Sequence, residues 1–207
     1  MKRDFPPYTL AIILVVVGGM LRLLESQYPD FLPSVSPLIA ISFVGAMYLP
    51  RKWGWLVGPF TLLLTDLAFL KLNQTTDGAG SMFSGVTLVV VAVYALAGGL
   101  GILISQRKSL GKILGGSVLC SLAFYFATNT FAWWHDLALH LNPGYAPTLA
   151  GWWQANTVGL PGYIPSLVFL RNGVLGDLFF TLVLLLVLDR GLLFGQAPNR
   201  TPRPASV

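Results

Sequence analysis

Charged and amide side chains interrupt the apolar runs of this chain at a few points, and these are the residues that could bind a ligand or carry out chemistry. Each lies within or at the end of an apolar run, as in LLLTDLAFLK at 62–71 and FLRNGVLGDLFF at 169–180. The first candidates are Arg22, Asp66, Asn129, Arg171, Asn172 and Asp177. An ionisable group inside a membrane is costly unless it is paired or hydrated, so such residues usually face a bundle interior or a cavity.

The spacing of these candidates limits which of them can pair. Arg171 and Asp177 are six residues apart, which is about 240° around a helix, so they do not face each other. We expect Asp177 or Asp66 to pair with Arg22, and Arg171 to cap the site near its mouth. The alternative is that Arg22, Asp66 and Asp177 form structural ion pairs that fix helix packing. A ligand-binding role predicts that D177N abolishes binding and keeps the fold.

The sequence contains no pattern typical of a catalytic site. It has no GxSxG, no HExxH, no Walker A loop and no dinucleotide fingerprint, so we expect no enzymatic activity. His135, Asp136 and His140 resemble a metal-binding cluster, but histidines five residues apart do not share a helical face, and a closed site needs further ligands. We therefore expect no metal and no cofactor. The single cysteine, Cys120, excludes an internal disulfide.

Aromatic residues gather in AWWHD at 132–136 and GWWQAN at 151–156. Tryptophan commonly anchors a protein at the membrane interface, but these two clusters are denser than anchoring requires. Rigid aromatic walls with a few amide donors suit a flat, medium-sized organic ligand. The further candidates for ligand contact are Trp133, Trp134, His135, Trp153, Gln154 and Asn156.

The composition indicates the solvent in which these residues lie. Of 207 residues, 55% are hydrophobic and 10% are charged, whereas a soluble domain usually carries about 25% charged residues. Such a chain cannot cover a water-facing surface, so we expect a membrane protein that contacts the lipid bilayer. The net charge is +5, but the basic residues are scattered in pairs and form no single basic face, which argues against a nucleic-acid partner.

Six apolar segments are long enough, or nearly so, to cross the hydrocarbon core as helices, which takes about 20 residues. They lie at roughly 8–24, 34–50, 53–71, 83–105, 110–134 and 167–189. Residues 147–157 predict a short interfacial helix, and QAPNRTPRPASV predicts a disordered tail. We therefore predict an all-α membrane protein with six transmembrane helices in one domain, residues 1–190, followed by a disordered cytoplasmic tail, residues 191–207.

Lysine and arginine residues predict the orientation of these helices. With the amino terminus in the cytoplasm, ten of the thirteen basic residues lie on the cytoplasmic side. The other three are Arg22, Lys71 and Arg171. Both termini are then cytoplasmic, and three loops, at about 25–33, 72–82 and 135–166, face outward. In this topology the candidate polar residues fall in one layer near the outer side, which predicts an outward-facing cavity.

Small residues mark places where helices could pack closely. Ala97 and Gly101, and again Gly111 and Gly115, have the small-xxx-small spacing of closely packed membrane helices. Such faces most often serve contacts within one protein. They could equally present a flat surface to a partner membrane protein, which keeps open a role as a structural or assembly subunit of a larger complex.

Several ordered motifs resemble a known family. They are RLL at 22–24, DFLPSVSPLIAISFVGAMYL at 30–49, LLLTDL at 62–67, ATNTFAWW at 127–134, PTLAGWW at 147–153 and FLRNGVLGDLFFTLVL at 169–184. Over most of residues 20–185 they are similar to an uncharacterised bacterial family of six-helix membrane proteins that resembles the S components of energy-coupling-factor (ECF) vitamin transporters. The resemblance implies an S-component-like bundle in the bacterial cytoplasmic (inner) membrane, with both termini inside. It also implies a substrate pocket open to the outside, built from the first, third and fifth loops and the later helices.

Within that superfamily, the cobalamin branch is the nearest substrate expectation. Some of its members hold cobalt through a thiolate in an outer loop, whereas the outer loops here contain no cysteine and the corresponding segment reads LNQTTDGAGSMF. His135 or His140 is the obvious substitute. The first helix also lacks the AxxxA pattern with which many S components dock on the shared coupling subunit, so the sequence leaves open whether an energising module is a partner.

These observations favour a membrane-embedded binding and transport protein for a vitamin or similar micronutrient. Its small-molecule ligand would occupy an outward-facing pocket beneath aromatic loops and would be released inward by alternating access. The alternatives are the structural or assembly subunit and, third, an intramembrane enzyme. A pocket lined by Asn129, Asn172 and Asp177 distinguishes the transporter from a scaffold, in which the protein's own side chains fill that space.

Overall fold

Helices make up the described fold. The computed structural model describes residues 7–27, 36–71, 85–139 and 144–194. Within these ranges, helices are joined by turns and loops, and no β-strand is present. The prediction of an all-α chain is therefore confirmed for the described ranges.

Three helices are long and apolar enough to cross a membrane. They are α5 (Gly85–Ile104), extended by the short helix η3 (Ser105–Arg107), α6 (Leu110–Leu139) and α8 (Ser166–Leu188). Their sequences are almost continuously apolar, and in lipid a helix satisfies each backbone N–H and C=O within its own segment. They correspond to the predicted segments 83–105, 110–134 and 167–189, except that α6 continues to Leu139.

The other three predicted spans contain shorter apolar helices. α1 covers Pro7–Gln27, and η2 (Gly54–Leu56) leads directly into α4 (Val57–Lys71). Between them lie α2 (Leu38–Ala40), η1 (Ile41–Gly45) and α3 (Ala46–Tyr48), which follow one another without a break and are here called the central segment. Among the described residues, only α5, α6 and α8 meet the length and apolarity of a membrane span.

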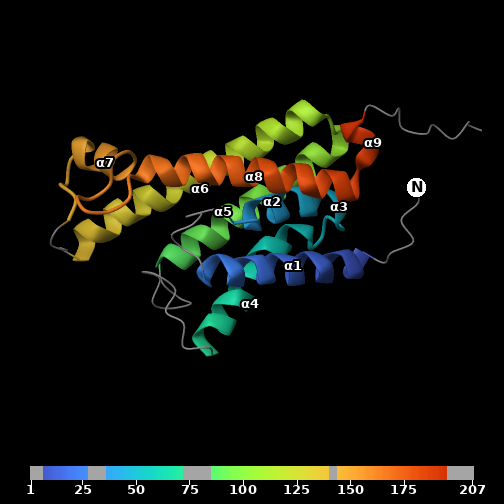
Figure 1. The fold of residues 1–207 in the computed structure, drawn as a ribbon, viewed down its shortest axis with the longest axis horizontal. Helices are drawn as coiled ribbons and strands as arrows, with labels where there is room; N and C mark the ends of the chain where they lie inside the picture. Colours follow the sequence, from blue (N-terminus) through green and yellow to red (C-terminus); the bar gives the residue numbers. More distant parts are fainter. Residues whose placement is uncertain (1–6, 28–35, 72–84, 140–143, 195–207) are drawn as a thin grey trace, which may run out of the picture.

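Figure 1 shows how the helices are arranged. α5, α6, α8 and α1 run along the long axis of the molecule, and the central segment lies among them, between α1 and α8. α4 packs against α1 and then diverges from the bundle. The loop that carries α7 (Leu149–Ala155) lies at one end of the bundle, while the start of α1 and the short helix α9 (Arg190–Leu193) lie at the other.

The central segment is enclosed by the other helices. Each of its residues except Tyr48 is buried, and Phe43 and Val44 are completely inaccessible. At 1.5 Å per residue the segment is about 16 Å long, against about 30 Å for the hydrocarbon core. It is therefore a core element, whereas the sequence predicted a membrane span over 34–50. Its middle, η1, is a π-helical turn, a feature often found near functional sites.

Glycines allow the neighbouring helices to lie directly against the central segment. A Cβ atom at Gly58 of α4 would overlap Ser42 Oγ, and a Cβ atom at Gly101 of α5 would overlap the carbonyl oxygen of Phe43. Gly101 belongs to the predicted small-xxx-small pair with Ala97, and both residues are buried. This pair therefore serves contact within the protein.

The short helices α7 and α9 can be compared with the predicted interfacial helix and the predicted domain end. α7 lies within the predicted interfacial helix 147–157, and its first turn is capped by Thr148, whose hydroxyl accepts a hydrogen bond from Gly151 N at 3.1 Å. α9 continues the ordered chain past the predicted domain end at residue 190. The remainder of the predicted tail, residues 195–207, lies outside the described residues.

Candidate functional site

A cavity of about 460 Å³ lies between α1, the start of the central segment, α5, α6 and α8. Ligand sites commonly enclose about 300–1,000 Å³, so this volume suits a small organic molecule. The lining residues are Arg22, Ser36, Ile39, Val86, Tyr94, Ser121, Phe124, Tyr125, Thr128, Asn129, Ala132, Phe169, Leu170, Gly173 and Asp177. Three residues predicted from the sequence, Arg22, Asn129 and Asp177, are among them.

The polar lining comes mainly from one stripe of α6. Ser121, Tyr125, Thr128, Asn129 and Ala132 follow at spacings of one, three or four residues and all line the cavity. Residues three and four apart lie on one face of a helix. α6 therefore presents this face to the cavity over about three helical turns.

Among the described residues, Asp177 is the ionisable group that the protein encloses most completely. Its residue is 2% exposed, and Ser121 Oγ donates a hydrogen bond of 2.6 Å to Asp177 Oδ2. The other oxygen, Oδ1, is buried and has no hydrogen-bond partner among the described residues. Buried polar atoms in native proteins are almost always satisfied, and an unsatisfied one is costly. A donor from a ligand or from water would satisfy Oδ1.

A seam of hydroxyl groups continues from Asp177 between α6 and α8. Ser117 Oγ and Thr181 Oγ1 lie 3.0 Å apart, and both residues are fully buried. Ser117 and Ser121 are four apart on α6, and Asp177 and Thr181 are four apart on α8, so the two polar pairs face each other. The sequence analysis missed Ser117, Ser121 and Thr181, although this matched spacing of four was visible in the sequence.

Arg22 and Asp66 form an ion pair at the α1 side of the cavity. Arg22 Nη1 lies 2.6 Å from Asp66 Oδ1, and the two side chains are 20% and 14% exposed. The same Nη1 donates to Thr65 Oγ1 and, at 3.2 Å, to the carbonyl oxygen of Leu62. The guanidinium also lies 5.2 Å from the centre of the Phe69 ring. Of the two predicted partners for Arg22, Asp66 is the one observed, and it lies behind Arg22, off the cavity lining.

The predicted aromatic and amide contacts lie near the end of α6 and in or just after α7, off the cavity lining. Trp133 Nε1 donates to the carbonyl oxygen of Ala146 at 3.0 Å, and Gln154 Nε2 donates to that of Gly159 at 3.1 Å. Loop backbone carries many carbonyl groups that need donors, and these side chains supply them. Trp134 is exposed, so it also lies away from the ligand-sized space.

The remaining aromatic and amide candidates are His135, Trp153 and Asn156. His135 stacks on Phe131 with ring centres 5.6 Å apart, and Trp153 is exposed. Asn156 is buried, and its backbone carbonyl oxygen accepts a hydrogen bond of 2.7 Å from the hydroxyl of the cavity-lining Tyr125. Asn156 therefore contacts the site indirectly, by fixing one of its walls to the loop.

Arg171 and Asn172 lie in the second turn of α8. Arg171 is exposed, its Nε donates to Asn172 Oδ1 at 3.2 Å, and neither residue lines the cavity. The predicted capping position of Arg171 over the cavity is therefore not observed. The α8 residues that line the cavity are Phe169, Leu170, Gly173 and Asp177.

His135 and Asp136, two residues of the cluster that resembles a metal site, lie among the described residues. Asp136 is buried and accepts a hydrogen bond from the backbone N–H of Tyr145. No group of three or more metal-ligating side chains occurs in the part of the chain that the structure describes, and His140 lies outside that part. Burial raises the pKa of the Tyr145 phenol, and the nearby Asp136 raises it further.

The end of the bundle opposite α7 is closed by a second polar contact. The Tyr48 hydroxyl donates to Asp189 Oδ2 at 2.9 Å, and Lys108 Nζ lies 3.7 Å from the same oxygen. Lys108 Nζ also lies 3.7 Å from the centre of the Tyr48 ring. This contact joins the end of the central segment, the turn after η3 and the junction of α8 and α9. The buried residues Phe43, Ile113 and Leu185 belong to one hydrophobic core cluster.

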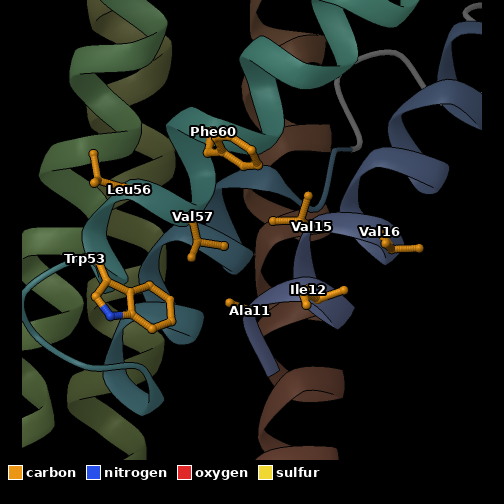
Figure 2. Close-up of a pocket in the computed structure, with 8 residues that line it drawn as sticks. All are labelled: Ala11, Ile12, Val15, Val16, Trp53, Leu56, Val57 and Phe60. Carbon is orange, nitrogen blue, oxygen red and sulfur yellow. The ribbon is translucent and has the colours of Figure 1, made fainter. Parts of the chain in front are cut away.

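A second hollow lies on the outside of the bundle and differs in chemistry. Figure 2 shows this groove of about 310 Å³ between α1 and the segment η2–α4. Its lining residues are Ala11, Ile12, Val15, Val16, Trp53, Leu56, Val57 and Phe60. Apart from the indole nitrogen of Trp53, these side chains offer no hydrogen-bonding group, so the groove lacks the polar groups that orient a specific ligand.

Comparison with other proteins adds a family. No curated protein and no solved structure matches the chain. Residues 3–190, which include every described helix except the last residues of α9, match a family whose function is unknown. By this match, the chain belongs to the family DUF6580.

Proposed function

We propose that this protein binds a small organic molecule in the cavity between α1, α6 and α8 and carries it across a membrane. It would then act as the substrate-binding unit of a transporter for a vitamin or similar micronutrient. One observation carries the proposal: Asp177 lines the cavity with a buried carboxylate oxygen that has no partner among the described residues. A purely structural carboxylate would be satisfied by the protein, whereas this one is left for a guest molecule.

The proposed topology has six crossings, with both termini in the cytoplasm of a bacterium. The start of α1 and α9 lie at the same end of the bundle in Figure 1, and most basic residues fall on that side of the proposed topology. α1 has 21 residues and is about 31 Å long, which is close to the thickness of the hydrocarbon core. In this proposal the chain would pass a second time through the central segment, which the other helices enclose, and a third time through η2–α4, although each is shorter than the hydrocarbon core.

The proposed mechanism is alternating access. The cavity lies toward the α7 end, which is the outer end in this topology, and the contact of Tyr48, Lys108 and Asp189 closes the other end. Ligand would enter at the α7 end, and release would require that contact to part. An energising transporter module, as in the ECF-like systems that the sequence resembles, or other membrane subunits are the proposed partners. The cavity suits a ligand of drug-like size; cobalamin is much larger and would need space beyond it.

Native mass spectrometry of the full-length protein in detergent tests this proposal. We expect the wild-type protein to carry a small molecule of discrete mass that is released on denaturation. D177N should lose it and keep the folded far-UV circular dichroism spectrum. The control is R171Q, which removes an exposed charge that lies off the cavity lining, and it should retain the molecule. A wild-type protein without any bound or bindable molecule would overturn the proposal.

The second candidate is a structural or assembly subunit. The observation that favours it is the face of α6 around Gly111 and Gly115, where both residues are exposed and a Cβ atom would meet nothing within 4 Å. If this candidate is correct, large substitutions such as G115L should abolish co-purification of a partner membrane protein. They should leave ligand retention unchanged if the transporter proposal is correct.

A further inference from the structure

We infer that the ligand of this cavity carries a positively charged nitrogen and that Asp177 binds it. This inference rests on the proposed function and names the chemical class of the ligand. The inference depends on how the charges of the cavity-lining residues are balanced.

The positive charge on the cavity lining is already balanced. Arg22 lies 2.6 Å from Asp66, and the same Nη1 is shared with Thr65 and Leu62. This pair is therefore close to neutral as seen from the cavity. Asp177 has no ion pair with any described residue, so the described residues supply no counter-charge to its carboxyl group.

Among the described residues, Arg22 is the only lysine or arginine that lines the cavity, and it is paired with Asp66. Lys71 and Arg171 are exposed and lie off the cavity lining. A cationic occupant of the cavity would therefore supply the counter-charge that the described residues do not.

The remaining lining suits a cation attached to a flat apolar body. Ser121 holds one oxygen of Asp177 at 2.6 Å, which leaves Oδ1 for a donor from the ligand. Tyr94, Phe124 and Phe169 supply aromatic walls, and aromatic faces attract cations as well as flat rings. A charge-assisted hydrogen bond from an ammonium group to a carboxylate is stronger than a neutral one, so the charge should decide selectivity.

Three probes with one ring system and different end groups test the inference. They are tryptamine, which is a cation at pH 7, tryptophol, which is neutral, and indole-3-propionate, which is an anion. Thermal unfolding of the detergent-purified full chain is measured as each probe is titrated. We expect tryptamine to raise the unfolding temperature and to bind at least about tenfold more tightly than tryptophol, with no shift from indole-3-propionate. D177N should reduce the tryptamine shift to the tryptophol level, and R171Q, which changes an exposed residue off the cavity lining, should behave as wild type.

The outcomes separate this inference from the proposed function. Equal shifts from the three probes, a preference for the anion, or an unchanged tryptamine shift in D177N would overturn the inference and leave a ligand-binding cavity. If no probe shifts the unfolding temperature, the charge of the co-purified molecule tests the inference. A cationic molecule supports the inference, and a neutral or anionic molecule overturns it. If no probe shifts the unfolding temperature and no molecule co-purifies, the proposed function itself is wrong. The wild-type comparison does not depend on how well D177N folds.

Discussion

Two adjacent glycines of α5 provide a sharp test of how the fold is held together. A Cβ atom at Gly98 would lie 2.7 Å from Trp55 Cα and 3.0 Å from the Trp55 carbonyl oxygen, whereas one at Gly99 would meet nothing within 4 Å. Ordinary contacts of a Cβ atom begin at 3.4 Å. The substitution G98A therefore requires η2 to move by about 0.7 Å, the difference between 3.4 and 2.7 Å, while G99A requires no movement.

The expected magnitudes follow from two opposing terms. Overpacking a core contact costs about 1–3 kcal/mol, and replacing glycine by alanine in a helix gains up to about 1 kcal/mol. G98A should therefore lose about 1–2 kcal/mol of unfolding free energy, and G99A should gain up to about 1 kcal/mol. The two variants, one residue apart, should differ by the overpacking term, about 1–3 kcal/mol, which is roughly a factor of 5 or more in the folding equilibrium.

Equilibrium unfolding in mixed detergent micelles, followed by tryptophan fluorescence and circular dichroism, measures this difference. Because η2 leads into α4, which carries Asp66, G98A should also weaken retention of the co-purified molecule, and G99A should not. Equal stabilities of G98A and G99A would refute the reasoning, since they would mean that η2 does not lie against α5 at Gly98.

Three further predictions concern the site and its loop. Asp66→Asn leaves Arg22 charged and partly buried without its carboxylate, so this substitution should cost roughly 2–4 kcal/mol of unfolding free energy. In a double-mutant cycle, the variant with both R22Q and D66N should recover part of this loss. Strictly additive losses would argue against the ion pair. Ser121→Ala removes the donor to Asp177 and should cost about 1–3 kcal/mol, with chemical denaturation as the measurement and an unchanged midpoint as the contrary result. Burial raises the pKa of Tyr145, so the folded state holds this phenolic proton more tightly than the unfolded state. The contribution of this proton to the free energy of unfolding is complete below the ordinary pKa of about 10. It is lost as the pH rises through the pKa of the folded state. The ultraviolet titration of wild type minus that of Y145F should show a midpoint above the ordinary value, and a midpoint at or below it would contradict the observed burial.

The long helices could be predicted from the sequence because lipid leaves an apolar chain few alternatives. A continuous apolar run of this length can satisfy its backbone within itself only as a helix, and α5 and α8 begin and end within about two residues of the predicted limits. The segment 34–50 shows where this reasoning fails. Apolar length alone does not separate a membrane span from a short buried helix, and the enclosing contacts of Gly58 and Gly101 come from distant parts of the chain.

The candidate site was predictable in its charged residues and not in its aromatic ones. Arg22 and Asp177 had to turn inward, since a charge facing lipid is costly whatever the fold. Trp133 and Gln154 faced a different choice, because an indole or amide donor satisfies a loop carbonyl as readily as a ligand. Their spacing contained no information about which acceptor would lie nearest, and the loop backbone proved to be that acceptor.

Two polar contacts beside the cavity each lie within one helix pair. Arg22 and Asp66 tie α1 to α4, whereas Ser121 and Asp177 tie α8 to α6. Tyr48 and Asp189 connect the central segment to α8 only at the far end. A rocking of one pair against the other about that far end would widen or narrow the chamber while every one of these bonds stays intact, so breathing of the chamber need not disturb either pair.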